Sequence, residues 1–344
     1  MRSLARSTPN IALIKYWGNR NEELRLPMAD SLSMTLDHPT VEISIEESDR
    51  FVIRSFDPDD NEKALTEKQM SRWEKTLDLC RRYLSTLHAS NTLPKNIALS
   101  IRSHIPPAVG LASSAAVFSC LAKAIAGFVA SKIELTDEQV SVLARLGSGS
   151  AARSIYGGFS ALLAKTQDPR PKTQDFDIDS SYAIQIAPTN HWLLQDIIVI
   201  PSHDEKKVGS TEGHALASTS PFYKQRIEDI RTRRQQECID AILKKDFEKL
   251  QHVTEEDALD MHHVMETSVP PLHYLTADTH RIVNAIKDLR TKEHFPVLFT
   301  MDAGPTVHLL CTEEAESKVL AFANAQKGCT IFSTKVGPGA SLLA

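Results

Sequence analysis

Three charged residues stand in stretches of this sequence where charge is uncommon, and their types suit chemistry on an anion. Lys15 and Asp302 each follow an apolar run. Arg153 lies within the glycine- and serine-rich stretch 147–159. An aspartate can accept a proton, a lysine can hold an anion, and the planar guanidinium of an arginine fits a carboxylate or a phosphate. Each of these side chains is therefore a candidate for catalysis or binding.

Each of the three also has an ordinary structural interpretation. A lysine at a strand end can extend its ammonium to water, whereas a buried lysine needs an anionic partner or loses its charge. Arg153 can cap a neighbouring loop. Asp302 follows one predicted strand and precedes another, so it can cap the turn of a hairpin through its own side-chain oxygens. Spacing alone leaves both interpretations open for each residue.

A serine-rich segment between a predicted strand and a predicted helix is a candidate phosphate site. Apolar residues alternate up to Ile101, which predicts a strand, and the Ala-rich stretch 115–129 predicts a buried helix. Gly110, Ser113 and Ser114 lie between them. The first N–H groups of a helix lack acceptors and attract phosphate, although an ordinary serine cap would use the same residues. The spacing matches neither of the common nucleotide-binding glycine motifs.

The composition is that of a globular protein without a basic surplus. Its 344 residues are 42% hydrophobic and 24% charged, and the formal net charge of −5 argues against nucleic acid and acidic membrane surfaces as partners. No apolar run reaches the ~18 residues of a membrane span, and no apolar signal core follows Met1, so we expect a cytoplasmic protein. Five scattered cysteines without a Cys-x-x-Cys pair predict buried, reduced thiols.

Two further polar segments have weaker signals. The segment 203–214 contains two lysines with Ser210 and Thr211, which could meet an anion or simply form a solvated loop. His262 and His263 are adjacent on a predicted helix and face different sides, so we interpret them as structural rather than as a metal pair. No metal-binding pattern is visible elsewhere in the sequence.

The chain is long enough for two domains, and its predicted strands come before most of its predicted helices. Alternating apolar residues predict strands early in the chain, and longer apolar periodicities predict helices in its later half. The polar stretch 165–190, with Pro169 and Pro171 near its start, is the candidate linker, which gives domains at 1–185 and 186–344. The stretch 10–18 starts as a predicted strand, and further strands are predicted at 26–36, 41–45, 51–55, 97–101, 159–164, 192–200, 297–301, 307–311 and 330–333. The predicted helices lie at 66–89, 115–129, 136–145, 221–243, 247–267, 277–290 and 313–325.

Four motifs in sequence order resemble those of one family, the mevalonate diphosphate decarboxylases, within the group of homoserine, mevalonate and galactose kinases. They are Asn-Ile-Ala-Leu-Ile-Lys-Tyr-Trp-Gly at 10–18, the serine loop at 107–114, Gly-Ser-Gly-Ser-Ala-Ala-Arg-Ser-Ile-Tyr-Gly-Gly-Phe at 147–159, and Phe-Thr-Met-Asp-Ala-Gly-Pro at 299–305. The wider group shares the serine loop, whereas the motifs with Arg153 and Asp302 belong to the decarboxylase branch.

The resemblance implies an activity, a fold and an assembly. It implies ATP-dependent decarboxylation of mevalonate 5-diphosphate to isopentenyl diphosphate, a step of isoprenoid biosynthesis, with ATP and Mg²⁺ as cofactors. The implied fold is the α+β, two-domain fold of the small-molecule kinases, with an N-terminal domain like ribosomal protein S5, a ferredoxin-like C-terminal domain and the active site between them. A homodimer is also implied.

The resemblance further assigns roles to individual residues. Asp302 would hold or deprotonate the substrate hydroxyl, Lys15 would keep Asp302 ionised, and Arg153 would hold the substrate carboxylate as the third catalytic residue. The implied contacts of the substrate and its phosphate tail are Tyr16, Asn19, Ser150, Arg153, Ser210 and Thr211. The implied contacts of ATP and its Mg²⁺ are Ser103, Gly110, Leu111, Ala112, Ser113 and Ser114.

Three positions depart from the family pattern. The family usually has lysine at Asn19, methionine at His214 and asparagine at Thr306. The lysine is expected to contact the terminal phosphate, and neighbouring Arg20 could compensate for its loss. Asn19 therefore raises a second possible substrate, mevalonate 5-phosphate. The motifs also leave open a kinase that stops at the 3-phosphate and a non-catalytic protein that binds nucleotide.

Overall fold

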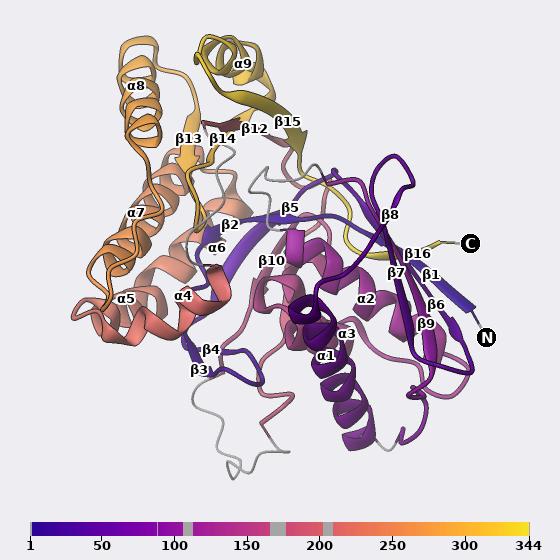
Figure 1. Cartoon of the computed structure of the whole chain (residues 1–344). Coiled ribbons are helices and arrows are strands. Elements are labelled where there is room, and N and C mark those ends of the chain that lie inside the picture. Colours follow the sequence, from indigo (N-terminus) through magenta and orange to yellow (C-terminus); the bar gives the residue numbers. More distant parts are fainter. Residues whose placement is uncertain (1, 88, 106–112, 166–176, 202–208, 344) are drawn as a thin grey trace.

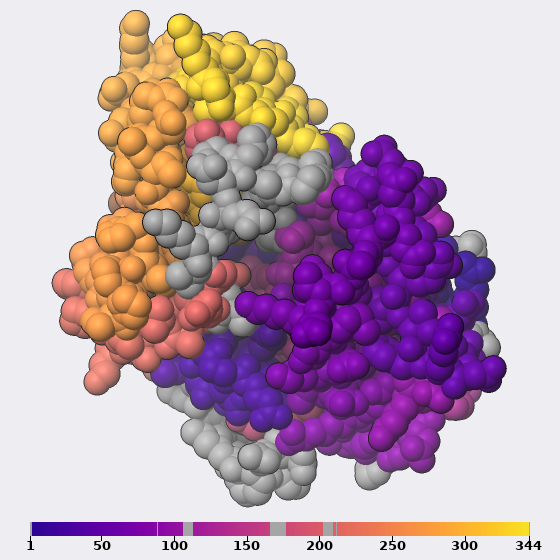
Figure 2. All heavy atoms as spheres, in the orientation of Figure 1, coloured from indigo at the N-terminus to yellow at the C-terminus, as the bar shows by residue number. Residues whose placement is uncertain are grey.

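Two groups of helices and strands lie side by side in the molecule (Figure 1). The structure is a computed structural model that describes residues 2–87, 89–105, 113–165, 177–201 and 209–343. Within these ranges the chain forms three larger sheets and a two-stranded ribbon of β3 (Asn19–Asn21) and β4 (Leu26–Pro27). In the space-filling view the surface is hollowed between the orange and the purple group (Figure 2). The architecture is of the α+β class, as the family resemblance implies.

The larger group is built on a six-stranded sheet. Its order is β16 (Ser341–Leu343), β1 (Arg2–Ser7), β6 (Val41–Glu47), β9 (Ile97–Ser103), β7 (Val52–Phe56) and β8 (Glu62–Lys63). All neighbouring pairs are antiparallel except β7 and β9. Three helices accompany the sheet, namely α1 (Glu67–Thr86), α2 (Ser113–Val129) and α3 (Asp137–Gly147). Alternate residues of β6 are buried because α2 packs across β1 and β6, and burial of this apolar face stabilises the group.

A second, four-stranded sheet lies between the two groups and supports the candidate site. Its order is β11 (Ala183–Ala187), β10 (Phe159–Leu162), β5 (Ser31–Thr35) and β2 (Asn10–Ile14). The apolar face shares a core with α6 (Gln235–Lys244) and α7 (Phe247–Glu266). The predicted hydroxyl face of β5 is not exposed, because the 3-10 helix η1 (Gly149–Ile155) covers it. Both faces of this sheet are therefore buried.

The third sheet belongs to the smaller group. Its order is β13 (Val297–Thr300), β14 (Val307–Thr312), β12 (Leu194–Ile200) and β15 (Thr330–Lys335), and all its pairs are antiparallel. One face shares a core with α8 (Ala277–Glu293) and α9 (Glu316–Asn324), and the other with α6 and α7. All seven residues of β12 are buried, which agrees with its nearly continuous apolar sequence.

Two parts of the chain differ from the sequence-based expectations. The end of the polar segment forms a short helix, α4 (Ser210–Leu216), whose Gly213 lies against the Trp17 ring. Seven residues are too few to show a clear helical period, so the sequence pattern did not predict it. The last strand, β16, returns to the six-stranded sheet and pairs with β1. A domain boundary at 185/186 stays a prediction.

All five cysteines are free thiols, and four of them are buried. Burial raises the pKa of Cys80 and of Cys311 to about 12. Cys329 is partly exposed, in contrast to the expectation that all five are buried. No helix in the described part of the chain combines the length and the apolar character that crossing a bilayer requires.

Candidate active site

Lys15 and Asp302 meet although they lie 287 positions apart in the sequence. Lys15 directly follows β2, and Asp302 lies just beyond β13, so two different sheets supply the pair. The ammonium Nζ donates a hydrogen bond to Asp302 Oδ1 at 2.7 Å. The lysine side chain is 1% exposed, whereas the aspartate side chain is 33% exposed. One side of the carboxylate is therefore held by the protein while the other remains accessible.

The surroundings keep this aspartate ionised. Burial alone would raise the pKa of Asp302, but the charge and the hydrogen bond of Lys15, together with the charge of Arg153, help to hold the pKa below its usual value. Burial lowers the pKa of Lys15, and the charge of Asp302 offsets part of that effect. At neutral pH the pair consequently provides a carboxylate that can accept a proton.

Arg153 lies in η1 and is almost completely buried. Its Nη1 donates to Ser31 Oγ at 2.6 Å and its Nη2 to Asn10 Oδ1 at 3.3 Å. Its Nε is buried and has no hydrogen-bond partner within the described residues. Burial lowers the pKa of Arg153 to about 10, so the guanidinium is still charged at neutral pH. Because the two hydrogen-bond acceptors named here are neutral, this cation is available for an anionic ligand.

Local sequence explains how η1 brings Arg153 close to β2. The Asn10 amide donates to the Ser150 carbonyl at 3.0 Å and to Ser154 Oγ at 2.7 Å, which ties the strand to the 3-10 helix. A side chain at Gly149 would overlap the Tyr16 ring. The small residues of the 147–159 motif thus permit close packing that bulkier residues would prevent.

The turn after Lys15 is packed tightly against α4. The His214 ring lies 4.5 Å from the rings of both Tyr16 and Trp17, and its Nδ1 accepts a hydrogen bond from the Gly18 N–H at 2.9 Å. Burial lowers the pKa of His214 to about 3, so the ring is neutral and can accept this bond. His214, which stands where the family usually has methionine, holds the turn in place.

Tyr16 and Asn19 also contact each other. The Tyr16 hydroxyl donates to Asn19 Oδ1, and Asn19 Nδ2 donates to Glu22 Oε2 at 2.9 Å. Arg20 does not lie free beside them, because its guanidinium pairs with Asp177 at 3.0 Å. Arg20 is therefore not an unpaired cation that could take the place of the lysine that the family usually has at position 19.

A row of hydroxyls connects the start of α2 with η1. Ser114 Oγ lies 3.2 Å from Ser148 Oγ, which lies 3.3 Å from Ser150 Oγ. Ser113, the first residue of α2, is exposed. The predicted phosphate contacts Gly110, Leu111 and Ala112 lie outside the described residues.

The remaining predicted site residues lie on neighbouring elements. Ser103 ends β9, and its hydroxyl accepts a hydrogen bond from the Ile105 N–H at 3.4 Å. Ser210 and Thr211 begin α4, and Ser210 is exposed. Their helix packs on the Trp17 ring through Gly213, so both belong to the same region as the lysine motif.

Sequence patterns did not single out two residues that bind the main chain of Lys15. Asp257 of α7 accepts a hydrogen bond from the Lys15 N–H at 2.7 Å, and Arg226 of α5 (Tyr223–Asp229) donates to the Lys15 carbonyl at 3.4 Å. One sequence signal could have pointed to this contact. Asp257 is a charged residue on the buried stripe of the helix that also carries the apolar Leu250 and Val264.

The two histidines of α7 do not form a metal site. His262 is buried and His263 is exposed, as expected for adjacent helical residues. Burial lowers the pKa of His262 to about 3, which keeps the ring neutral. Across the described ranges, no group of three or more histidine, cysteine or acidic side chains could hold a metal ion.

Comparison with known protein families matches both parts of the chain. The model "Diphosphomevalonate decarboxylase-like N-terminal domain" matches residues 7–173. The model "Mevalonate 5-diphosphate decarboxylase C-terminal domain" matches residues 196–337. The first match contains Lys15 and Arg153, and the second contains Asp302.

Individual relatives agree with the family models. The diphosphomevalonate decarboxylase of Candida albicans is 33% identical over 321 residues, which cover 91% of this chain and 84% of the relative. The human enzyme of that name is 31% identical over 328 residues, covering 91% of this chain and 77% of the relative. A solved structure described as "MDDEF in complex with MVAPP, AMPPCP and Magnesium" has a TM-score of 0.84 at 30% identity and covers 100% of this chain and 99% of its own. Mevalonate diphosphate decarboxylase from Staphylococcus aureus has a TM-score of 0.84 at 29% identity, with coverages of 100% and 98%.

Proposed function

This chain belongs to the diphosphomevalonate decarboxylase family, and we infer that it uses ATP to convert mevalonate 5-diphosphate into isopentenyl diphosphate, ADP, phosphate and carbon dioxide. It is thus a carboxy-lyase of the mevalonate pathway with the two-domain fold of the small-molecule kinases. The observation that carries the proposal is the Lys15–Asp302 contact of 2.7 Å, with the charged Arg153 close enough to lower the pKa of Asp302.

The chemistry requires a base beside a tertiary alcohol. A tertiary hydroxyl is a poor leaving group, but its phosphorylation makes departure feasible, and loss of carbon dioxide then supplies the electrons of the double bond. Asp302 accepts the hydroxyl proton as the oxygen attacks the terminal phosphate of ATP. Lys15 keeps Asp302 ionised and oriented.

Arg153 is suited to bind the carboxylate of the substrate. Its guanidinium holds the substrate carboxylate while Ser150 donates a hydrogen bond to it or to a neighbouring substrate oxygen. This arrangement aligns the carboxylate for loss as carbon dioxide. Tyr16, Asn19, Ser210 and Thr211 contact the phosphate tail, and they belong to the lysine motif and to the helix that packs on it.

The hydroxyls at the start of α2 are suited to bind the phosphates of ATP. The relative described with AMPPCP and magnesium supports ATP and Mg²⁺ as cofactors of this chain. The donor set fits, because Ser113 and Ser114 begin a helix and Ser148 lies beside Ser114. We assign the nucleotide contacts to Ser103, Ser113 and Ser114 together with residues 110–112. With Mg²⁺ held beside these serines on the ATP phosphates, the ion would supply positive charge to neutralise the transferred phosphate.

The deciding experiment compares the two possible substrates with the purified chain. ADP release is followed by a coupled assay with mevalonate 5-diphosphate and with mevalonate 5-phosphate, and carbon dioxide is measured in parallel. We expect both products from the diphosphate, which the names of the relatives favour. ADP without carbon dioxide would indicate a kinase, and nucleotide binding without turnover of either ester would indicate a non-catalytic protein.

The Arg153→Ala variant tests the carboxylate contact. We expect kcat/KM for mevalonate 5-diphosphate to fall by about 30- to 1000-fold, because removing one partner of a buried charge pair costs about 2–4 kcal/mol. The KM for ATP should change little. Steady-state kinetics with each substrate varied in turn gives both values, and Arg281→Ala, an exposed arginine on α8, is the control. A loss of ATP affinity equal to the loss of kcat/KM would contradict this role.

The Asn19→Lys variant tests the departure from the family pattern. A lysine here restores a charge-assisted contact to the terminal phosphate of the substrate, worth roughly 1.5–3 kcal/mol. Because Glu22 lies 2.9 Å from the Asn19 amide and would compete for the new charge, we expect the KM for the diphosphate to fall about tenfold, the lower end of that range. Initial rates at varied substrate measure it, and an unchanged KM would show that position 19 does not face the tail.

Two further properties are proposals, the assembly from family resemblance and the location from the sequence. We propose that the chain forms a homodimer and acts in the cytoplasm. Sedimentation equilibrium of the purified chain tests the first, and a mass of one chain at micromolar concentration would contradict it. Fractionation of producing cells tests the second.

A further inference from the structure

The main chain of Lys15 lies at the end of an edge strand. Within the described residues β2 pairs with β5 alone, and the register between these strands shifts between Ala12 and Ile14. No described strand therefore pairs with Lys15 on its open side. An edge strand normally satisfies its free N–H and C=O groups with water, but β2 is buried along its whole length.

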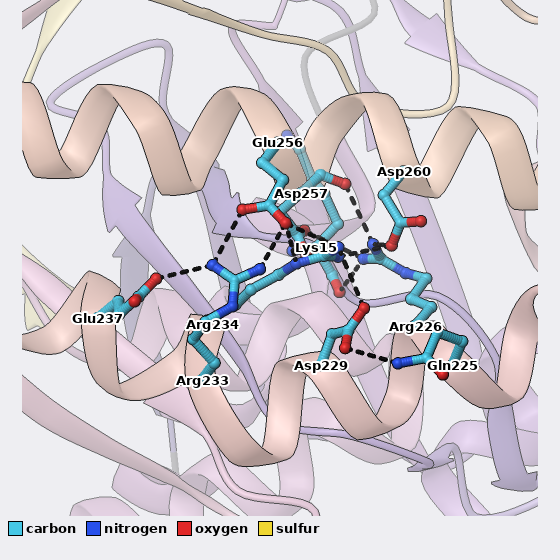
Figure 3. A network of polar contacts seen from close by, with 10 residues as sticks. All are labelled: Lys15, Gln225, Arg226, Asp229, Arg233, Arg234, Glu237, Glu256, Asp257 and Asp260. Carbon is cyan, nitrogen blue, oxygen red and sulfur yellow. Dashed lines mark hydrogen bonds and ion pairs between the residues drawn. The ribbon is translucent and has the colours of Figure 1, made fainter.

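Two charged side chains take the place of the missing strand. The Lys15 N–H donates to Asp257 Oδ2 at 2.7 Å, and the Lys15 carbonyl accepts from Arg226 Nη2 at 3.4 Å (Figure 3). The same Nη2 donates to Asp257 Oδ2 at 3.0 Å. Both side chains are 0% exposed. A buried ion pair thus contacts both polar groups of the Lys15 main chain.

The ion pair belongs to a larger network of charged side chains. Arg226 Nη1 donates to the Asp257 carbonyl at 3.1 Å and to Asp260 Oδ2 at 2.8 Å. Arg234 Nη1 reaches Asp257 Oδ1 at 3.4 Å and Asp260 Oδ2 at 2.5 Å from a π-helical turn, η3 (Ile230–Arg234). Figure 3 shows both arginines pointing toward α7. Every contact fixes α5 and η3 to the helix that carries Asp257.

We propose that Asp257 and Arg226 are positioning residues of the reaction, which hold the Lys15 main chain so that its ammonium stays in contact with Asp302. This inference rests on the proposed function. A lysine side chain has a flexible four-carbon stem, so the place of its ammonium depends on how firmly its own backbone is held. A buried ion pair contributes little net stability, so stability alone does not account for this one. A positioning role does account for it.

The network also affects the charge of Lys15. The carboxylate of Asp257 raises the pKa of Lys15 and so opposes part of the effect of burial. Removing that negative charge makes Lys15 lose its proton at a lower pH. The charged and titratable groups that face Lys15 are Asp302, Asp257, Arg153, Arg226 and His262.

Asp257→Asn and Asp260→Asn form a matched pair of variants. Each removes one carboxylate that binds Arg226 and Arg234, but of the two only Asp257 contacts Lys15. We expect Asp257→Asn to lower kcat about 10- to 100-fold, the effect of a small displacement of a catalytic group, while the KM for ATP stays within about twofold. The alkaline limb of its kcat profile should begin at a lower pH. Asp260→Asn should lower Tm but leave kcat within about twofold of wild type.

Every outcome of this comparison decides the proposal. Equal losses of kcat in both variants, or a kcat of Asp257→Asn within twofold of the control, would show a purely structural network. If Asp257→Asn does not fold, Arg226→Lys replaces it, because lysine keeps the charge but cannot bridge Asp257 and the Lys15 carbonyl at once. A wild-type kcat for that variant overturns the proposal, and so does failure of both variants to fold.

The wild-type chain serves as the reference for the proposed function. If it releases no ADP and carbon dioxide with mevalonate 5-diphosphate, the proposed function fails before any variant is compared. If the wild type is active and Asp257→Asn retains full kcat, only the positioning role fails. The two failures are therefore distinct.

Discussion

An Asp302→Asn variant should lose about 10²- to 10⁴-fold in kcat, the contribution expected of a general base. The amide has nearly the shape of the carboxylate and can still accept a hydrogen bond from Lys15 Nζ, but it cannot take up the hydroxyl proton. The substrate hydroxyl would then keep its proton and attack the terminal phosphate of ATP more slowly. Coupled ADP release and carbon dioxide release should fall together, because decarboxylation follows phosphorylation.

Nucleotide affinity separates this loss from general damage. Calorimetric titration with an ATP analogue should give a Kd within about twofold of wild type, because the proposed nucleotide contacts lie on α2 and β9 rather than after β13. Asp278→Asn, which changes an exposed carboxylate on α8, is the matched control and should keep full kcat. A kcat of Asp302→Asn within tenfold of wild type would remove the base from the mechanism.

A Lys15→Met variant should lower kcat about 10²- to 10⁴-fold, because Asp302 then lacks the cation that orients it and keeps it ionised. Methionine has a stem of similar length and no charge, so it fills the buried space without the ammonium. Lys123→Met is the matched control, since Lys123 pairs with Asp137 at 2.9 Å on the surface of α2. It should retain wild-type kcat.

The pH dependence of kcat gives an independent test with a definite sign. Lys15 lowers the pKa of Asp302, so its removal raises that pKa, and activity should be lost at a higher pH as the solution is acidified. Burial lowers the pKa of Lys15, so any alkaline limb of the wild type that reports Lys15 should begin below the ordinary lysine pKa and disappear in the variant. An acid limb that does not move would show that Lys15 and Asp302 are not coupled in solution.

The two buried arginines of this region, Arg145 and Arg153, differ in what they contact. Arg145 has its guanidinium directed at backbone carbonyls, among them that of Ser181 at 2.9 Å, so it acts as a structural anchor. Arg153 lies in the adjacent 3-10 helix and hydrogen-bonds two neutral side chains instead. Two arginines eight positions apart therefore have different roles, and their contacts rather than their residue type separate them.

Much of the architecture follows from local patterns in the sequence. The threonines at 66 and 136 each begin a helix with a capping box, and alternation at 41–45 forms β6. The short-range signals succeed because helix caps and strand alternation depend on neighbouring residues. The same signals missed α4, whose few residues become helical against the Trp17 ring.

The sequence by itself determined which residues could react, because Lys15, Arg153 and Asp302 are charged residues in small or apolar surroundings within motifs of one family. Only the tertiary structure decided that Lys15 and Asp302 touch, since two sheets must pack together before residues so distant in the chain can meet. It also decided that Asp257 and Arg226 hold the main chain of Lys15. Backbone contacts of this kind have no sequence signature, because every residue offers the same N–H and C=O groups.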